Sequence, residues 1–231
     1  MKKSLKISQL ILIGLLISTT FGYSQSKQKL PDNFVYLKDI APTIKSELRY
    51  ITKNNFIGKP INGYLKNKTI LSYPTAIALK KIQQQLLPFN LSLKVYDAYR
   101  PQQAVDHFVK WATILNDTLM KKEYYPKVPK NQLFKLGFIA SKSSHTRGST
   151  VDITIIDKLT NTELDMGSPY DFFGSESHPI YKNITKKQRA NRLLLRELML
   201  NNGFKPYENE WWHFTLKSEP FPKTYFNFPV E

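Results

Sequence analysis

The feature that most restricts how this chain can fold is the absence of cysteine from its 231 residues. Without thiols the chain forms no disulfide, thiolate zinc site or iron–sulfur cluster, and it has no cysteine nucleophile. Its stability must therefore come from a hydrophobic core. A hydrophobic content of 41% and an aromatic content of 13% exclude a disordered chain. At this length we expect one domain, which buries about 70% of the surface that the unfolded chain exposes.

The first 24 residues have the composition of a secretory signal peptide. Three lysines precede an apolar run at residues 10–17, and Gly22 and Ser24 stand where a signal peptidase requires small residues. The alternative is an anchor that stays in the membrane, but the run is shorter than the roughly 20 residues needed to span a bilayer. We therefore expect an exported protein, periplasmic or secreted, with no membrane anchor after cleavage. Loss of the three lysines lowers the formal net charge from +16 to +13.

The remaining residues predict a short tether at 25–35 and a single domain at 36–231. Apolar residues recur at helical spacing in some segments and alternate with polar residues in others. These patterns predict helices at 71–87, 101–115 and 185–202, and strands at 91–97, 151–156 and 211–216. The polar, proline-interrupted residues 116–137 are expected to form a surface excursion. The mixture favours an α+β fold with helices packed on a mainly antiparallel sheet.

Two histidines occur in patterns that suit a divalent metal ion. His145 precedes Asp152 by seven residues, with Gly148 between them for a tight turn into the strand. His213 follows Glu210 by three residues in the stretch Glu-Trp-Trp-His. Either pair alone also occurs in protein cores and surface networks. Together they offer two imidazoles and a carboxylate, which suits catalytic zinc because three protein ligands leave a fourth position for water.

Two further residues could take part in hydrolysis at such a site. Glu210 is held by the same segment as His213, and it could accept the proton of an attacking water and return it to the leaving amine. Arg100 ends the stretch Tyr-Asp-Ala-Tyr-Arg after a predicted strand, where it could stabilise the oxyanion of a tetrahedral intermediate. The alternative for Arg100 is a salt bridge that anchors the following helix.

Taken together, these motifs resemble those of the D-alanyl-D-alanine dipeptidases, a branch of the zinc D,D-peptidases. The shared patterns are SxHxxGxxxD, Glu-Trp-Trp-His and DxYRP, and further similar stretches lie at 48–56, 164–171, 177–178, 191–196 and 225–229. The similarity covers residue 36 to the C-terminus. It implies a small α+β fold that is shared with zinc D,D-carboxypeptidases and with the hedgehog signalling domain.

The resemblance also implies a role for each site residue, with one zinc ion per chain. The zinc ligands are His145, Asp152 and His213, the general base and acid is Glu210, the transition state is stabilised by Arg100, and the substrate is held by Tyr50, Ser143 and Asp171. A free dipeptide is a zwitterion, so its pocket needs an anion for the ammonium and donors for the carboxylate. Asp171 could supply the anion, or it could simply cap a turn. Ser143, Tyr50 or backbone N–H groups could supply the donors.

Other polar residues are expected to be structural. His178 is expected to fix a loop near the site rather than to bind metal, and His107 to lie on the helix at 101–115. Basic runs are expected to be solvated helix faces, and no nucleic-acid motif accompanies them. Thr150, where some relatives have alanine, places a hydroxyl near the expected ligands.

The leading hypothesis is an exported zinc dipeptidase that hydrolyses D-Ala-D-Ala to two D-Ala. Relatives in glycopeptide resistance act in the cytoplasm, whereas an exported enzyme would serve the turnover or scavenging of cell-wall dipeptide. One alternative is a D,D-carboxypeptidase that trims peptidoglycan stem peptides. Another is a non-catalytic zinc domain that binds envelope polymers through its positive charge, but such a domain would have no use for Glu210.

Overall fold

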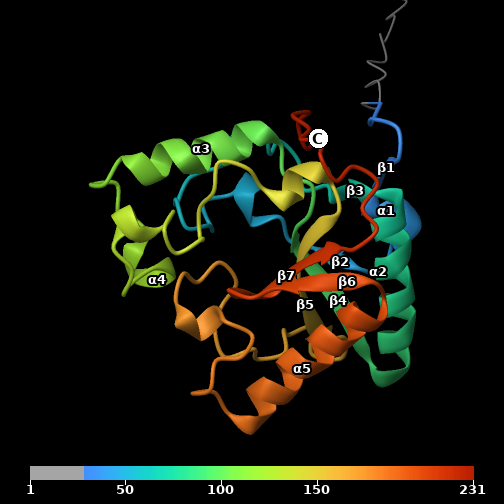
Figure 1. Ribbon diagram of the computed structural model, residues 1–231. Coiled ribbons are helices and arrows are strands. Elements are labelled where there is room, and N and C mark those ends of the chain that lie inside the picture. Colours follow the sequence, from blue (N-terminus) through green and yellow to red (C-terminus); the bar gives the residue numbers. More distant parts are fainter. Residues whose placement is uncertain (1–28) are drawn as a thin grey trace, which may run out of the picture.

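A five-stranded mixed sheet forms the centre of the computed structural model, which describes residues 29–231 (Figure 1). The expected signal peptide lies outside the described residues. In spatial order the strands are β2 (Lys45–Ser46), β4 (Leu91–Asp97), β5 (Thr150–Asp157), β7 (Glu210–Leu216) and β6 (Phe204–Tyr207). Strands β2 and β4 run parallel, and all other neighbours run antiparallel. The expected α+β fold with a mainly antiparallel sheet is confirmed.

A separate antiparallel pair, β1 (Phe34–Tyr36) with β3 (Ile70–Ser72), lies at the N-terminal end of the described chain. The expected tether at 25–35 therefore ends earlier than predicted, because Phe34 pairs in a strand and is buried. Strand β3 also takes the first residues of the helix expected at 71–87. Strands β1 and β3 have three residues each, which is too short to show an alternation of polar and apolar side chains. Both boundaries were therefore missed.

The α-helices fall into two groups. Helix α1 (Leu37–Ile40), α2 (Tyr73–Leu86) and α5 (Lys186–Asn201) supply residues to the core of the sheet, whereas α3 (Gln102–Thr113) and α4 (Lys121–Tyr124) lie together at the opposite side of the ribbon in Figure 1. Short 3₁₀ turns connect these elements at Arg49–Ile51, Leu87–Phe89, Lys130–Gln132, Ser144–Arg147 and Ser175–Ser177. None of the helices within residues 29–231 combines the length and apolar character needed to cross a bilayer.

Two hydrophobic cores result from this arrangement. The first, called here the sheet core, is mainly aliphatic and includes Val151, Ile153 and Ile155 of β5 together with buried residues of α2 and α5. The second, called here the aromatic core, contains Phe56, Phe108 and other aromatic side chains from α3, α4 and the turns around them.

Helix α5 shows how local sequence sets an element while packing sets its orientation. Thr185 and Gln188 form a reciprocal capping box at its start, and Gly203, with φ of +88°, follows its end. Leu194 is 38% exposed, whereas Leu195 is fully buried. Helical spacing in the sequence does not decide which of these two leucines faces the sheet core.

Most residues of the segment 116–137 are exposed, as expected, but a few of its side chains anchor it to the domain. It contains α4, and Tyr124, Tyr125 and Leu133 are buried in the aromatic core. The ammonium of Lys130 is buried as well, where it donates to the carbonyl oxygens of Ile114 at 2.7 Å and Asp117 at 2.6 Å. The segment thus lies mostly at the surface, and two of its aromatic residues, Tyr124 and Tyr125, fix it to the aromatic core.

Candidate active site

Strand register brings Asp152 and His213 together. The two residues lie directly opposite each other on the antiparallel strands β5 and β7. Successive side chains point to opposite faces of a strand, and Val151 and Ile153 on the other face are buried in the sheet core. A shift of one residue would expose those two side chains, so burial of the core holds the carboxylate and the imidazole in register.

His145 reaches the same point from the 3₁₀ turn Ser144–Arg147. Gly148 ends this turn with φ of +81°, and a Cβ there would collide with the ring of Phe34. The Nδ1 of His145 donates to the carbonyl oxygen of Ala98 at 2.7 Å. Because a carbonyl only accepts, this bond places the proton on Nδ1 and leaves the lone pair of Nε2 free to bind a metal.

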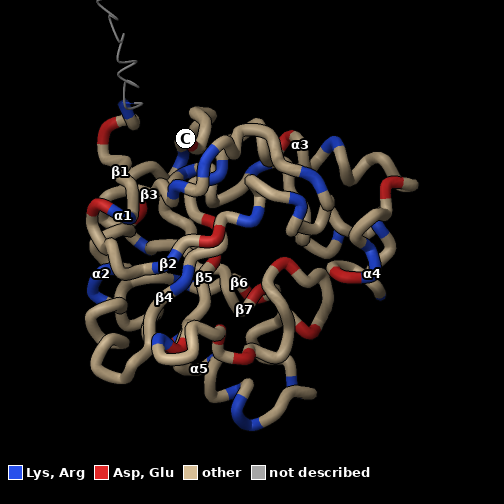
Figure 2. Tube along the Cα trace, turned by 180° about the vertical axis from the view of Figure 1, so that it is seen from behind, with Lys and Arg blue, Asp and Glu red and all other residues tan. Residues whose placement is uncertain are grey.

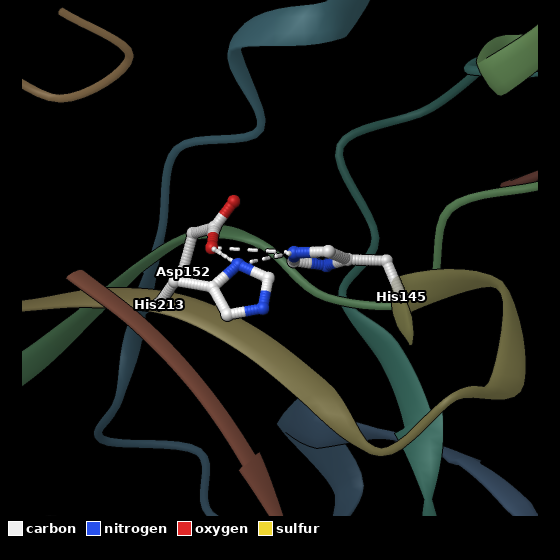
Figure 3. Close-up of side chains that lie close together, drawn as sticks. All are labelled: His145, Asp152 and His213. Carbon is white, nitrogen blue, oxygen red and sulfur yellow. Dashed lines mark hydrogen bonds and ion pairs between the residues drawn. The ribbon is translucent and has the colours of Figure 1, made fainter. Parts of the chain in front are cut away.

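The three potential ligand atoms converge on one another (Figure 3). Asp152 Oδ1 lies 3.2 Å from His145 Nε2 and 3.1 Å from His213 Nδ1, and the two nitrogens are 3.3 Å apart. Ligands at zinc distances of about 2.0–2.1 Å in a tetrahedron lie about 3.3 Å from one another. Asp152 Oδ1 is buried and has no hydrogen-bond partner among the described residues. The cluster therefore fits a zinc ion, which would satisfy that oxygen.

The charged groups in and beside the cluster shift one another's pKa values. Burial alone would raise the pKa of Asp152, but His145 and His213 hold it below its usual value. Burial also opposes protonation of His213, yet Asp152 and Glu210 outweigh it and raise the pKa of this imidazole to about 9. The cluster thus has the excess negative potential that attracts a cation, and a metal ion would displace the imidazole proton.

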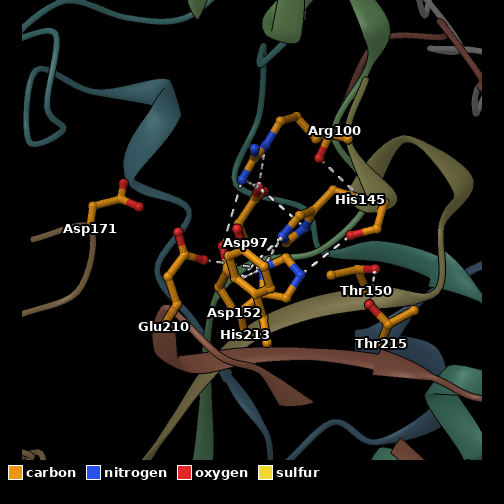
Figure 4. A network of polar contacts seen from close by, with 12 residues as sticks. Asp97, Arg100, His145, Thr150, Asp152, Asp171, Glu210, His213 and Thr215 are labelled. Carbon is orange, nitrogen blue, oxygen red and sulfur yellow. Dashed lines mark hydrogen bonds and ion pairs between the residues drawn. The ribbon is translucent and has the colours of Figure 1, made fainter. Parts of the chain in front are cut away.

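Glu210 begins β7 and stands beside the cluster (Figure 4). Its Oε2 lies 3.4 Å from His213 Nδ1, and its side chain lines the cavity in front of the cluster. The other oxygen of Asp152, Oδ2, accepts from the hydroxyl of Tyr170 at 3.2 Å. Asp152 is thereby held with Oδ1 turned toward the two histidines.

Arg100 is held at the edge of the same cavity by a buried carboxylate. Its Nε and Nη2 each lie 2.9 Å from Asp97 Oδ2, and Nη2 is 3.6 Å from Asp152 Oδ2. The guanidinium also lies over the rings of Tyr50 and Phe108, at 5.3 and 5.2 Å. Arg100 does form a salt bridge, but its partner Asp97 ends β4 rather than lying on the following helix, and the bridge holds the guanidinium beside the cluster.

Three residues of this network, Tyr64, Asp97 and Tyr170, were not predicted from the sequence. Asp97 is fully buried and accepts from the hydroxyl of Tyr64 at 2.6 Å, and Tyr170 supports Asp152. Asp97 lies within the DxYRP motif, so its position was visible in the sequence, but its partner Tyr64 is 33 positions away in the chain. The hydroxyl of Thr150 forms a hydrogen bond with the hydroxyl of Thr215 on the paired strand, at 2.8 Å.

The remaining predicted site residues meet in a cavity of about 210 Å³. Tyr50, Ser143 and Asp171 all line it together with the cluster, Glu210 and Arg100. Asp171 faces Glu210 from across the cavity in Figure 4, and its Oδ2 accepts from the hydroxyl of Tyr50 at 2.8 Å. Burial, with a smaller contribution from Asp152, raises the pKa of Asp171 well above its usual value.

The two other histidines lie outside this cavity. The backbone carbonyl of His178 accepts from Arg192 at 2.7 Å, so this loop is tied to α5. The Nδ1 of His107, on α3, accepts from the backbone N–H of Asn62 at 3.2 Å. Both contacts are structural, in line with what we expected from the sequence.

Comparison with known proteins identifies the class of site. A profile of the family described as D-ala-D-ala dipeptidase matches residues 31–231. The chain belongs to this family. It is 39% identical to a D-alanyl-D-alanine dipeptidase of Enterococcus faecalis over 201 residues, which is 87% of this chain and 100% of the relative.

Two further curated relatives carry the same name. The protein of Streptomyces coelicolor is 36% identical over 198 residues, 86% of this chain and 98% of the relative. The protein of Escherichia coli is 32% identical over 182 residues, 79% of this chain and 83% of the relative. Membership confirms the expected class, a zinc-dependent peptidase, and the cluster of His145, Asp152 and His213 is where the chain could hold that ion.

Proposed function

We propose that this chain is an exported zinc dipeptidase that hydrolyses D-Ala-D-Ala to two D-Ala. The observation that carries the proposal is the unpartnered, buried Oδ1 of Asp152, which lies between two imidazoles beside the cavity that Glu210 and Asp171 also line. The cavity volume of about 210 Å³ is below the roughly 300–1,000 Å³ of pockets for drug-sized ligands. A small substrate fits such a site best.

The residues around the cluster divide the work of hydrolysis. Zinc held by His145, Asp152 and His213 would supply Lewis acidity, which lowers the pKa of water and polarises a peptide carbonyl. Glu210, within 3.4 Å of His213, is placed to accept the proton of the attacking water and to deliver it to the leaving amine. Arg100 is placed to stabilise the negative charge that develops on the carbonyl oxygen.

The opposite wall of the cavity suits the two charges of a free dipeptide. The raised pKa of Asp171 would fall when a substrate ammonium lies beside it, so the carboxylate and the ammonium stabilise each other's charge. Tyr50 already donates to Asp171 and so orients it. Ser143 Oγ accepts from the backbone N–H of His145 at 3.3 Å, which leaves its proton for the terminal carboxylate of the substrate. Tyr50 is therefore a weaker candidate than Ser143 for binding the carboxylate.

The proposed location rests on the N-terminal sequence. The lysines, apolar run and small residues at 1–24 support cleavage near Ser24 and release outside the cytoplasm. There the enzyme would degrade dipeptide that is released from the wall, for turnover or scavenging. N-terminal sequencing of the protein from its native host tests this, and a chain that begins at Met1 in the cytosol would contradict it.

Two alternatives are less well supported. A D,D-carboxypeptidase needs an open path for a stem peptide, whereas here the cavity is small and Asp171 lies within it. A non-catalytic domain that binds polymers would gather its cations on one surface, but Lys and Arg are scattered over many elements in Figure 2.

The test is to incubate the zinc-loaded protein with D-Ala-D-Ala, L-Ala-L-Ala and a stem pentapeptide that ends in D-Ala-D-Ala, and to measure amine release. We expect hydrolysis of the first substrate and at most slow hydrolysis of the other two. Preferred cleavage of the pentapeptide would favour the carboxypeptidase, and no cleavage of any substrate would favour the binding domain.

A further inference from the structure

One stretch of backbone, residues 136–140, runs along the rim of the cavity. Gly137, Phe138, Ile139 and Ala140 line the cavity together with the metal cluster, although they belong to no helix or strand. Residues 136–140 are called here the rim segment. None of these residues takes part in the proposed chemistry. The contacts that hold them in place indicate a different role.

On one side the rim segment is anchored in the aromatic core. The ring of Phe138 stacks on that of Phe173, with centroids 5.0 Å apart and planes 21° apart, and Ile139 is buried. Phe173 follows Asp171 by two residues and lines the same cavity. The rim segment therefore packs against the loop that carries Asp171, the residue proposed to bind the substrate ammonium.

On the other side the rim segment is tied to the turn between β6 and β7. The hydroxyl of Tyr207 donates to the carbonyl oxygen of Gly137 at 3.2 Å, and Asn209 Nδ2 donates to that of Leu136 at 3.3 Å. Asn209 Nδ2 also donates to the Tyr207 hydroxyl, at 3.2 Å. Two side chains of one turn thus hold two successive carbonyl groups.

The contact is close enough to require glycine. Gly137 has φ of +78°, and a Cβ at this position would lie 2.9 Å from Tyr207 Oη. The ring of Tyr207 also packs against His213, with centroids 5.3 Å apart. The turn that carries Glu210 and leads to a potential zinc ligand is therefore the same turn that holds the rim segment.

We infer that Tyr207 and Asn209 act as a latch that keeps the rim segment across the cavity and so restricts the substrate to dipeptides. The inference rests on the proposed dipeptidase function and assigns specificity to two positioning residues. A longer peptide continues as an amide where a dipeptide has its ammonium, and it needs an exit at the end of the cavity that the rim segment covers. Without the latch, the rim segment keeps the Phe138 stack, the buried Ile139 and local backbone hydrogen bonds to Leu133 and Phe134, but it loses its tie to β6 and β7, and this exit can open.

The first test compares substrates of different length. Tyr207→Phe removes only the hydroxyl and keeps the ring on His213, and Asn209→Ala removes the second donor. Tyr73→Phe, an exposed tyrosine on α2, is the matched control. The substrates are D-Ala-D-Ala and the tripeptide L-Ala-D-Ala-D-Ala, and zinc content and Tm are measured for every variant.

For the double latch variant we expect the ratio of tripeptide to dipeptide kcat/KM to rise about tenfold, as the loss of one or two hydrogen bonds allows. KM for D-Ala-D-Ala should rise while kcat changes little, because the latch does not touch the reacting atoms. Each single variant should show a smaller change in the same direction, and the control none. An unchanged ratio in the folded, zinc-loaded double variant would overturn the latch.

A second test does not depend on activity. Hydrogen exchange of the backbone amides at 137–140 should become faster in the latch variants, while exchange in β5 and β7 stays as in the wild type. Wild-type exchange rates at 137–140 in the double variant would refute the latch. If the wild-type protein fails to cleave D-Ala-D-Ala, the proposed function is wrong, and the exchange data still decide whether the latch exists.

Discussion

The sheet core and the aromatic core each support one wall of the active site, and they do so by different means. Asp152 and His213 stand on paired strands whose register is enforced by backbone hydrogen bonds and by buried aliphatic neighbours. Tyr50 and Asp171 come from a 3₁₀ turn and a loop that are held by packed aromatic rings. Strand register allows few alternative geometries for the wall that carries Asp152 and His213, called here the metal wall. Packed loops allow the opposite wall, with Tyr50 and Asp171 and called here the substrate wall, to be adjusted.

This difference predicts two kinds of defect. Changes on the metal wall should remove zinc or the chemical step, and changes on the substrate wall should mainly alter KM and specificity. The following substitutions test that division, beginning with the largest expected effect.

His213→Ala should lose most of the zinc and nearly all activity, because two remaining protein ligands do not form a stable site. Elemental analysis and hydrolysis of D-Ala-D-Ala measure the two effects. His107→Ala, on α3 and outside the cavity, is the control and should keep both zinc and activity. Full zinc occupancy in His213→Ala would remove this residue from the ligand set.

Glu210→Gln should keep zinc and the fold while lowering kcat by about 10²–10⁴-fold, the range for general acid–base catalysis. The substitution preserves the shape of the side chain and removes only its ability to take a proton. Steady-state kinetics on zinc-loaded protein measure the loss. A kcat close to that of the wild type would show that another residue moves the proton.

Arg100→Ala should lower kcat by roughly 10²–10³-fold with a comparatively small change in KM, because the guanidinium meets charge that develops in the transition state. If Arg100 instead clamps the substrate carboxylate, KM should rise steeply. Thermal unfolding must accompany the kinetics, since loss of Arg100 leaves the buried carboxylate of Asp97 without its cationic partner, which costs about 3–5 kcal/mol. Arg100→Lys, which keeps a positive charge, separates the catalytic effect from that destabilisation.

Asp171→Asn should raise KM for D-Ala-D-Ala about 10–100-fold, as expected for losing a charged hydrogen bond, and should leave zinc bound. The matched probe is N-propionyl-D-Ala, which keeps the scissile amide and the size of the dipeptide but has no ammonium. With that probe the wild type and the variant should differ little. An equal loss on both substrates would assign Asp171 to holding the loop rather than to binding the ammonium.

Thr150→Ala should have the smallest effect. It leaves the buried hydroxyl of Thr215 without its partner, so we expect a loss of about 1–3 kcal/mol in the free energy of unfolding and no change in zinc content or kcat. Chemical denaturation measures the loss. Recovery of stability in Thr150→Ala/Thr215→Val would confirm that the two hydroxyls serve only each other, and a changed kcat would place Thr150 in the active site.

The residues of the metal wall were predictable because they occur in pairs that lie close together in the sequence. His145 and Asp152 lie on one turn and the strand that follows it, and Glu210 and His213 lie on one strand, so short motifs carry both pairs. The main helices and strands were likewise visible as periodic patterns. The orientation of α5 and the buried side chains within 116–137 were not, because polarity within a segment does not reveal which neighbour will cover it.

From the sequence alone came the α+β class, the residue types of the metal cluster and the carboxylate beside it. Tertiary structure alone decided how Asp152 is turned, what holds Arg100 and how the cavity is closed. Those contacts join residues far apart in the chain: Tyr64 and Asp97 are 33 positions apart, and Tyr207 and Gly137 are 70. Periodicity and motifs report the neighbours of a residue along the chain, whereas these hydrogen bonds exist only after two separate cores have packed and brought distant side chains within reach.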